Sequence, residues 1–457
     1  MKRLISCVLA LLYVMAGFAS GTWILHGKEY RVDTLYHAYI GPGTTQTSIK
    51  LAGPVNLRVF YTTTDLKNEN VDVRAIKHKD TLTGLGTVSN AAESHSTSNR
   101  SYFAGINADF FSSSMPCGIT VVDGEVYCSD QASGWSLFGI DANKIPYSGG
   151  GDFYVKLTAP DYSTAELSAM NLERETNGLV LYSSRKGANT GTDSNGSEVV
   201  LIPDGEGNFL TPGATVRMRV QGNPSHAGSM PIPDNGYILS GSGTKESFVS
   251  NLSEGDVVEV RCAIRFNGFT GGKIQQALGG CPMLVSGGKV LDTENALDHL
   301  TSAQPRTAVG YNAEKNKLVM LVADGRSSIS VGPISKVLAD IMIYAGCSEA
   351  MNFDGGGSST FYVKGEGVIN QPSDGSERSV TDGLYLSTDA PQNDVTITTI
   401  RFMDYSKTLN QGDAYTPVIY GYNQYGVLVD RNVEGVTLSC GSSLGTITND
   451  GTTSVSY

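Results

Sequence analysis

The stretch that decides the fold is residues 350–363, which read AMNFDGGGSSTFYV. Apolar runs on both sides predict two strands, and between them Asp354 is followed by three glycines and three hydroxyl residues. Glycine lets the backbone approach a ligand closely but costs conformational entropy, so a simple turn rarely needs three in succession. A flexible hairpin is one interpretation, and a carboxylate beside a crowded polar pocket is the other. A nucleotide-phosphate loop is disfavoured, because no lysine follows the glycines and a strand comes next.

A helix is predicted just upstream of this stretch, between Gly332 and Gly346. Pro333 suits a first-turn position, where its missing N–H costs little. Apolar residues then recur at steps of three and four, the spacing of one helix face, and Gly346 fits the position just past a helix end. The helix leads into the strand that ends at Asp354, so a rigid element positions this carboxylate, as in most binding sites.

Most of the remaining chain up to residue 388 has the pattern of strands and turns. Residues 55–61 and 71–76 are predicted strands, and residues 103–111 read as a core strand that ends at a polar corner. A short helix is expected within residues 87–99, capped by Thr87. The prediction is an α+β fold, with a β-rich mixed-sheet catalytic domain that contains a few helices.

The chain divides into four predicted parts. Residues 1–20 have the basic, apolar and small-residue pattern of a cleaved signal peptide, and the apolar run is shorter than the roughly 20 residues that span a bilayer. Residues 21–388 form the main domain, and residues 389–394 are a linker rich in Pro, Asn and Asp. Short strand patterns in residues 395–457 suggest an all-β immunoglobulin-like module, incomplete or unusually small because such a sandwich needs roughly 100 residues.

Composition limits the partners of this chain. Its 54 glycines and 17% charged residues suit a β-rich protein outside the cytoplasm. The formal net charge of −12 gives no general attraction for nucleic acid or anionic lipid, so an anionic substrate must be held by local arginines. We therefore expect an exported protein, periplasmic, cell-surface or secreted, with no nucleic-acid partner and no membrane span.

Cysteine spacing argues against a zinc ribbon, because no Cys-x-x-Cys pair occurs. Cys117 and Cys128 flank an apolar hairpin pattern with an Asp-Gly turn at residues 123–124. Their near-symmetric placement predicts a disulfide, and two separate buried thiols are the alternative.

Six segments combine a strand-like run with a polar or glycine-rich end, and five of them supply the charged candidate residues. Carboxylates can act as acid, base or nucleophile in glycoside cleavage, and arginines can hold a phosphate at two points. No histidine lies in these segments and no Gly-x-Ser-x-Gly elbow precedes a helix, which disfavours a Ser-His-Asp hydrolase. For each aspartate before a glycine a turn is the plain alternative, and for each arginine a surface ion pair. The candidates are Asn107, Asp109, Arg306, Asp324, Arg326, Asp354, Asp374, Glu377 and Arg378.

These motifs, with their order and the intervening helix, resemble the phosphodiester glycosidase family over about residues 27–388. The resemblance implies hydrolysis of the glycosidic bond of a sugar-1-phosphodiester such as N-acetylglucosamine-1-phosphodiester. Residues 417–430 are similar to bacterial immunoglobulin-like modules, which implies a bacterial protein acting on envelope or environmental glycans. The segments that carry the family resemblance are GINADFF (105–111), PRTAVG (305–310), LVADGR (321–326), NFDGGGSST (352–360) and PSDGSER (372–378), and the aspartate with its three glycines is the most specific.

The resemblance implies a role for each residue. Asp354 is the carboxylate at the anomeric centre, with Glu377 or Asp324 as its partner. A phosphate monoester is a good leaving group, so charge neutralisation by Arg306, Arg326 and Arg378 replaces protonation of the leaving oxygen. Asn107, Asp109, Gly355, Gly356, Ser358, Thr360 and Asp374 are expected to bind or position the substrate.

Two matters stay open at this point. No cofactor is required by this chemistry, although aspartate-rich turns could hold Ca²⁺ and no complete calcium-loop motif is present. The same residues also fit two other functions, a non-catalytic glycan-binding surface module and a phosphodiesterase that breaks the P–O bond.

Overall fold

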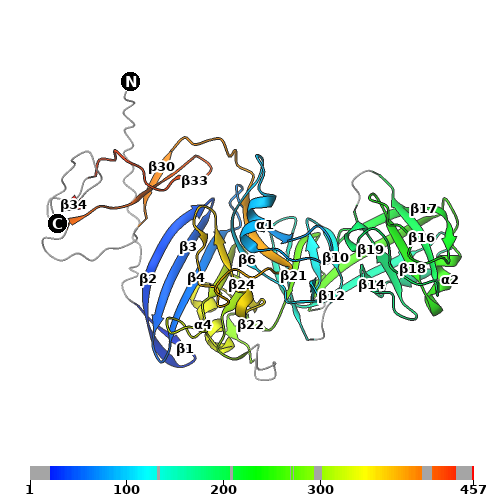
Figure 1. Cartoon of the computed structure of the whole chain (residues 1–457), viewed down its shortest axis with the longest axis horizontal. Helices are drawn as coiled ribbons and strands as arrows, with labels where there is room; N and C mark the ends of the chain where they lie inside the picture. The colour runs from blue at the N-terminus through cyan, green and yellow to red at the C-terminus, as the bar shows by residue number, and fades with distance from the viewer. Residues whose placement is uncertain are drawn as a thin grey trace.

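The computed structural model describes residues 21–130, 134–205, 209–267, 269–270, 272–292, 301–403, 414–438 and 455–456. The predicted signal peptide lies outside the described residues, as does Cys440. Figure 1 shows an elongated arrangement, with the strands of residues 164–266 at one end and those of residues 21–65 toward the other, where the C-terminal strands lie beyond them. The segment of chain between these two groups of strands lies in the middle of the molecule, together with the first helix.

The first sheet has nine strands, in the order β1-β2-β3-β4-β25-β24-β26-β22-β23. Every neighbouring pair in it is antiparallel. The strands are β1 (Gly21–Leu25), β2 (Lys28–Gly41), β3 (Thr44–Ala52), β4 (Asn56–Asp65), β22 (Met283–Ser286), β23 (Lys289–Val290), β24 (Arg306–Tyr311), β25 (Lys317–Ala323) and β26 (Glu349–Asn352).

The second sheet has thirteen strands, in the order β10-β9-β21-β11-β12-β19-β17-β16-β18-β15-β14, with β13 on β12 and β20 on β19. Its pair β14–β15 is parallel. The strands are β9 (Thr120–Val122), β10 (Glu125–Cys128), β11 (Ser136–Asp141), β12 (Pro146–Thr158), β13 (Thr164–Glu166), β14 (Ala169–Met170), β15 (Leu179–Tyr182), β16 (Ser197–Pro203), β17 (Thr215–Ser225), β18 (Tyr237–Gly241), β19 (Val257–Phe266), β20 (Phe269–Thr270) and β21 (Ile274–Gly280).

The third sheet has five strands in the order β28-β27-β6-β29-β5. A two-stranded ribbon of β7 (Phe111–Ser112) and β8 (Met115–Pro116) follows β6 in the chain. The strands of the third sheet are β5 (Asp72–Lys77), β6 (Ser101–Asn107), β27 (Phe361–Val363), β28 (Gly367–Val368) and β29 (Asp382–Thr388).

Both predicted helices are confirmed. In α1 (Val88–His95) the Thr87 hydroxyl accepts a hydrogen bond from the Asn90 N–H, as an N-cap residue should. Helix α4 (Ser335–Tyr344) starts after Pro333 and ends before Gly346, whose φ of 98° suits glycine. A third helix, α2 (Glu246–Ser250), and the 3₁₀ turns η1 (Ser184–Lys186), η2 (Gly243–Lys245) and η3 (Gly356–Ser358) complete the described set. None of the described helices is long and apolar enough to cross a bilayer.

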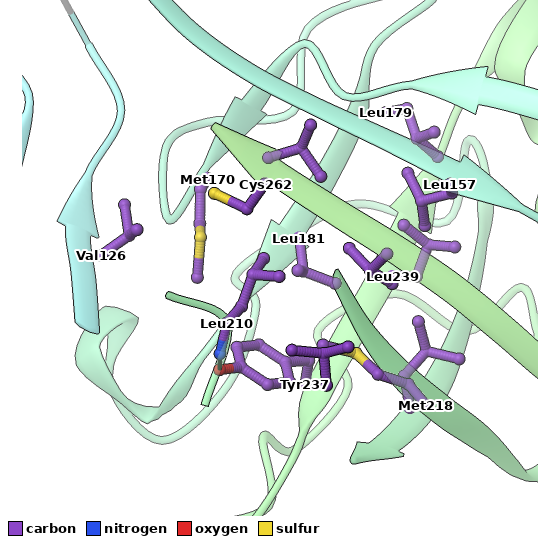
Figure 2. Close-up of a cluster of buried hydrophobic side chains, with 14 of the residues drawn as sticks. Val126, Leu157, Met170, Leu179, Leu181, Leu210, Met218, Tyr237, Leu239 and Cys262 are labelled. Atoms are coloured by element: carbon purple, nitrogen blue, oxygen red, sulfur yellow. Dashed lines mark hydrogen bonds between the residues drawn. The ribbon is translucent and has the colours of Figure 1, made fainter. Parts of the chain in front are cut away.

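Two large cores hold the sheets together. One fills the second sheet, where Figure 2 shows Leu181 and Leu210 beside Tyr237, whose hydroxyl accepts a hydrogen bond from the Leu210 N–H. The other receives side chains from all three sheets, and it places them in contact around the chain segment 353–361. Its members include Phe60, Ile106, Phe138, Leu278, Val309, Phe353, Phe361 and Leu384.

The segment between β26 and β27 crosses from the first sheet to the third. This is the stretch with Asp354 and the three glycines, so the two strands predicted on either side of it are confirmed but do not form a hairpin. Apolar anchors at both ends, Phe353 and Phe361, are fully buried. The crossing therefore has fixed ends, and its backbone is held between two sheets.

The predicted hairpin with an Asp-Gly turn is confirmed as β9–β10, with φ of 50° at Asp123 and 83° at Gly124. The predicted disulfide beside it is not formed in the structure, where Cys117 and Cys128 are both free. Cys128 is fully buried and its sulfur accepts a hydrogen bond from the Asp130 N–H, whereas Cys117 is half-buried in the loop after β8. The alternative of two separate thiols is the one observed.

The C-terminal part forms a small sheet of β30 (Thr399–Phe402), β32 (Ile419–Tyr422) and β33 (Leu428–Asp430), and a pair of β31 (Ala414–Tyr415) with β34 (Val455–Ser456). Tyr420 and Tyr422 pack on Ala38 of β2, and the Tyr422 hydroxyl donates to the Tyr39 carbonyl. Residues 395–397 and 435–438 have strand-like sequence patterns, but they are not strands in the structure. The immunoglobulin-like module and the linker boundary stay predictions.

Replacing Leu239 with alanine is expected to destabilise the second sheet by about 2–5 kcal/mol, because this side chain is fully buried in β18 and its loss leaves a cavity. The midpoint of urea unfolding, followed by circular dichroism, measures the effect. Leu35→Ala is the matched control, since Leu35 is 55% exposed in β2. Equal midpoints for the two variants would contradict this assignment of the core.

Candidate active site

The candidate site lies where the ends of strands from two sheets meet. Asp354 follows β26, Asn107 ends β6, Arg306 begins β24, and Asp382 begins β29. Antiparallel neighbours bring a strand's end beside the next strand's start, so these positions share one edge. Chain segments more than 200 residues apart in sequence are thereby brought together.

Asn107 joins the two sheets through its side-chain amide. It is 1% exposed, and its Oδ1 accepts hydrogen bonds from the Thr307 hydroxyl (2.8 Å) and from the Thr360 N–H (3.1 Å). Its Nδ2 donates to the Asp354 carbonyl at 2.7 Å, and the Asp354 N–H donates to the Ala108 carbonyl at 2.8 Å. Asn107 therefore fixes the backbone on both sides of the three glycines, and it positions the loop instead of facing a substrate.

Each of the three glycines lies against a different arginine. A Cβ placed on Gly355 would lie 3.7 Å from Cδ of Arg306, and one on Gly356 would lie 3.0 Å from Nη2 of Arg326. A Cβ on Gly357 would overlap Nη2 of Arg378 and the carboxylate of Asp374. The side chains thus pack directly on the loop backbone, and this close approach is the structural reason for a run of glycines.

Two of these arginines face each other without a partner of opposite charge. Arg306 is 2% exposed, its Nη2 donates to the Ser302 carbonyl, and its Nε has no partner. Burial, and then the nearby Arg326, lower the pKa of Arg306 to about 10. The Arg326 Nε donates to the Gln304 side-chain oxygen at 2.6 Å. Across the described ranges neither guanidinium is paired with a carboxylate, which is the electrostatic arrangement of an anion site.

The third arginine is held by an acid. Arg378 forms an ion pair with Asp374 at 2.6 Å, and its Nη1 lies 3.4 Å from the Ser358 hydroxyl. The side chains are 41% and 37% exposed, so the pair sits at the solvent side of the loop. Asp374 orients Arg378 in this arrangement, and its role in substrate binding stays a prediction.

Asp354 lies near Arg378 and near two further carboxyl groups, those of Asp109 and Asp382. Its pKa is raised to about 6, mainly by burial and to a smaller extent by Asp382. The Ser358 hydrogen bond and the charge of Arg378 act in the opposite direction. A carboxylate with this pKa is ionised at neutral pH and is more basic than an ordinary aspartate, as a nucleophile or general base requires.

Asp109 and Asp382 form a buried carboxyl pair behind Asp354. The Asp109 N–H donates to Asp382 Oδ1 at 2.9 Å, and the Gly118 N–H donates to Asp109 Oδ2 at 2.8 Å. Burial, and then Asp382, raise the pKa of Asp109 well above its ordinary value. Burial also raises the pKa of Asp382, which the charge of Lys77 opposes. The Oδ1 atom of Asp109 has no hydrogen-bond partner among the described residues. The carboxyl group packs against Gly279, behind the glycine loop.

Two predicted catalytic carboxylates lie outside this cluster. Glu377 accepts hydrogen bonds from the Ser89 N–H (2.8 Å) and the Ser89 hydroxyl (2.5 Å), at the first turn of α1. An acid there satisfies free N–H groups and favours the helix dipole. Asp324 is buried behind β25, where its Oδ1 accepts the Gln371 N–H at 2.8 Å. Glu377 and Asp324 therefore make structural hydrogen bonds, and neither is placed beside Asp354.

The sequence analysis missed three residues of the cluster, Gly357, Lys77 and Asp382. Lys77 is 2% exposed and its Nζ donates to the Thr381 carbonyl at 3.2 Å. A signal for Asp382 was present, because this acid begins the otherwise apolar strand of residues 383–386. No group of three or more His, Cys, Asp or Glu residues in the described part of the chain is arranged to hold a metal ion.

The chain is similar to several known proteins. Residues 212–387 match the model of the family described as phosphodiester glycosidase. YomE, an uncharacterized SPbeta prophage-derived protein of Bacillus subtilis (strain 168), is 40% identical over 88 residues. That match spans 19% of this chain and only 13% of the relative's length.

Solved structures share the fold at low identity. A hypothetical protein from Synechocystis superposes with a TM-score of 0.58 and 15% identity over 76% of this chain and 62% of that one. A proposed exported protein of Burkholderia pseudomallei K96243 superposes with a TM-score of 0.54 and 21% identity. This match covers 72% of this chain and 74% of that one. The catalytic domain of zebrafish N-acetylglucosamine-1-phosphodiester alpha-N-acetylglucosaminidase superposes with a TM-score of only 0.39 and 13% identity. This match covers 78% of this chain and 87% of that one.

The family match covers Asp354, its three glycines and the three arginines that pack on them, while Asn107 and Asp109 precede it. By that match, residues 212–387, which are less than half of the chain, are similar to the phosphodiester glycosidase family.

Proposed function

We propose that this protein is an exported hydrolase that cleaves the glycosidic bond of a sugar-1-phosphodiester. The observation that carries the proposal is the glycine loop that follows Asp354, against which Arg306 and Arg326 pack without an acidic partner in the described part of the chain, while Arg378 lies near the Asp354 carboxylate. A buried guanidinium without an acidic partner is costly, and a bound phosphate diester would supply the missing charge. A carboxylate next to an anion site is the pairing that this reaction needs.

The bond changes follow from these positions. The anomeric C–O bond breaks, and its electron pair leaves with the phosphate monoester oxygen, whose charge the guanidiniums stabilise. Asp354 either adds to the anomeric carbon and is later displaced by water, or takes a proton from the water that adds. In both cases the water oxygen ends on the sugar, and the distance between acting carboxylates separates retention from inversion.

The buried pair Asp109 and Asp382 has a supporting role in this proposal. Burial is the main cause that keeps the pKa of Asp354 above the ordinary value, and the charge of Asp382 adds to it, which strengthens Asp354 as a nucleophile or base. No metal is needed, because guanidiniums occupy the place where a cation would neutralise the phosphate. A chelator is therefore expected to leave the rate of hydrolysis unchanged. A loss of activity that added Ca²⁺ restores would contradict the proposal that no metal is needed.

Export and a bacterial glycan substrate belong to the same proposal. The first 20 residues have a signal-peptide pattern, and the Burkholderia structural neighbour is described as exported. An envelope or environmental glycan joined through phosphate, N-acetylglucosamine-1-phosphodiester being one example, is the substrate class that fits both the site and the compartment.

Hydrolysis in ¹⁸O-labelled water tests the bond that breaks. With N-acetylglucosamine-1-phosphate aryl diesters and related sugars, label is expected in the anomeric hydroxyl and not in the phosphate. Label in the phosphate would instead identify a phosphodiesterase. Glycan binding without turnover of any sugar phosphodiester would identify a binding module.

Asp354→Asn is expected to lower turnover by about 10⁴-fold or more, because the amide cannot add to carbon or accept a proton. Substrate binding, measured by calorimetry, should remain within about threefold, since the arginines are untouched. Asp161→Asn, at an exposed turn, is the matched control. Full activity in Asp354→Asn would remove this residue from the mechanism.

The pH dependence of kcat/KM provides a separate test. Asp354 must be ionised, and its pKa is raised to about 6, so activity should fall as the pH drops through about 6. Ser358→Ala removes the hydrogen bond that lowers this pKa, so the acid limb should move to higher pH. Ser376→Ala, exposed in a neighbouring loop, should leave the profile unchanged. If kcat/KM of the unmodified protein fell only near pH 4, or did not fall at acid pH, the role of ionised Asp354 would be contradicted.

Gly357→Ala tests the contact between the loop and the arginines. The added methyl group would overlap the Arg378 guanidinium and the Asp374 carboxylate, so the ion pair must move. A displacement of this kind is expected to lower kcat/KM by about 10- to 100-fold, mainly by raising KM. Steady-state kinetics measure the change, and circular dichroism checks the fold. Unchanged kinetics in folded Gly357→Ala would show that Arg378 is dispensable.

A further inference from the structure

A cavity of about 540 Å³ lies between the chain that leads into β11 and the start of β12. This region is in the middle of the molecule in Figure 1, where β10, β12 and β21 are labelled. Its volume is in the range of small-ligand sites. The side chains that matter below are Asp130, Trp135, Ser136, Asp152 and Phe153, together with Gly150.

The cavity adjoins the candidate active site. The ring of Trp135 contacts that of Phe110 edge to face, with centroids 5.0 Å apart. Phe110 directly follows Asp109, the carboxyl behind Asp354. The half-buried Cys117 lies between the two places: burial raises the pKa of its thiol to about 11, with Asp109, Asp130, Asp354 and Asp382 adding to the effect. The charges of one carboxylate of the cavity, Asp130, and of three at the candidate active site, Asp109, Asp354 and Asp382, therefore all act on the pKa of this thiol.

The lining has the chemistry of a sugar site. Trp135 and Phe153 supply flat apolar surface, on which the C–H face of a pyranose ring can pack. Asp130, Asp152 and the serines supply acceptors for sugar hydroxyls. In its described part the lining contains two carboxylates and no Lys or Arg. Asp152 is ion-paired with Arg265, which lies outside the lining, so no lining side chain there attracts an anion.

We propose that this cavity binds a neutral sugar unit attached to the glycosyl group that the active site releases. The inference rests on the proposed function for its position along the substrate. The phosphate half of a glycosyl phosphodiester belongs with Arg306, Arg326 and Arg378, and the described lining of the cavity offers it no lysine or arginine. The sugar half is what the cavity can take, so the protein prefers oligosaccharide phosphodiesters to monosaccharide ones.

Calorimetric titration tests the cavity without requiring turnover. The probes are neutral trisaccharides of N-acetylglucosamine and of glucose, the matching monosaccharides, and a glucuronic-acid disaccharide as the anionic comparison. At least one neutral trisaccharide is expected to bind more tightly than its monosaccharide. Trp135→Ala should weaken that binding about tenfold or more, and Trp135→Phe, which keeps a flat ring, should retain most of it.

A second variant acts from the opposite strand, in case the tryptophan variants fold poorly. Gly150 pairs with Ser136 across β11 and β12 and is exposed, and a Cβ there would meet only Asn267 Oδ1, at 3.1 Å. Gly150→Leu should therefore fill the cavity from its edge and abolish trisaccharide binding. Hydrolysis of a monosaccharide phosphodiester should be unchanged in this variant and in Trp135→Ala.

The outcomes separate the two proposals. Trisaccharide binding that is lost in Trp135→Ala supports the cavity even if no phosphodiester is hydrolysed, which would refute the proposed function alone. Hydrolysis with no binding of any neutral trisaccharide overturns the cavity and leaves the function standing. Preference for the glucuronic-acid disaccharide, or equal loss of monosaccharide hydrolysis in both variants, also overturns it.

Discussion

The amide of Asn107 is the interaction on which the candidate site depends. It ends a strand of the third sheet, accepts from Thr307 in the first sheet, and holds both ends of the glycine loop through Asp354 and Thr360. Each of its polar groups is satisfied in a buried place, where an unmade hydrogen bond would cost about 1–3 kcal/mol. The register between the two sheets and the position of the Asp354 carboxylate are therefore set by one side chain.

Close packing of charge on bare backbone is the second constraint. The guanidiniums of Arg326 and Arg378 and the Cδ of Arg306 approach three consecutive glycines, and a single methyl group on Gly357 would collide with the Arg378 guanidinium. Two of the guanidiniums repel each other, a cost that the fold sustains because β24 and the Arg326 turn are fixed by their own hydrogen bonds. Such stored repulsion is typical of sites whose ligand brings the opposite charge.

Charge divides the site into two sides. Basic groups gather on the glycine loop, and carboxyl groups gather behind Asp354 and toward the cavity at Trp135. Asp354 stands at the boundary, with Arg378 lowering its pKa and Asp382 raising it. A substrate with one anionic half and one neutral half matches this division, which links the proposed reaction to the proposed sugar subsite.

Much of this protein could be predicted from its sequence, because the relevant physics is local. Alternation marked β5, three- and four-residue steps marked α4, and an Asp-Gly pair marked the β9–β10 turn. Three glycines after an acid marked the loop, because only close approach explains them. What tertiary structure decided is which charges meet. Glu377 and Asp324 were the predicted partners of Asp354, yet one lies at a helix end and the other behind a strand, while Asp382 and Lys77 reach the site from separate strands. Likewise the cysteine spacing permitted a disulfide, but Cys117 and Cys128 are free in the structure. Sequence spacing reports neighbours along the chain, whereas the meeting of strand ends depends on sheet order, which no local pattern encodes.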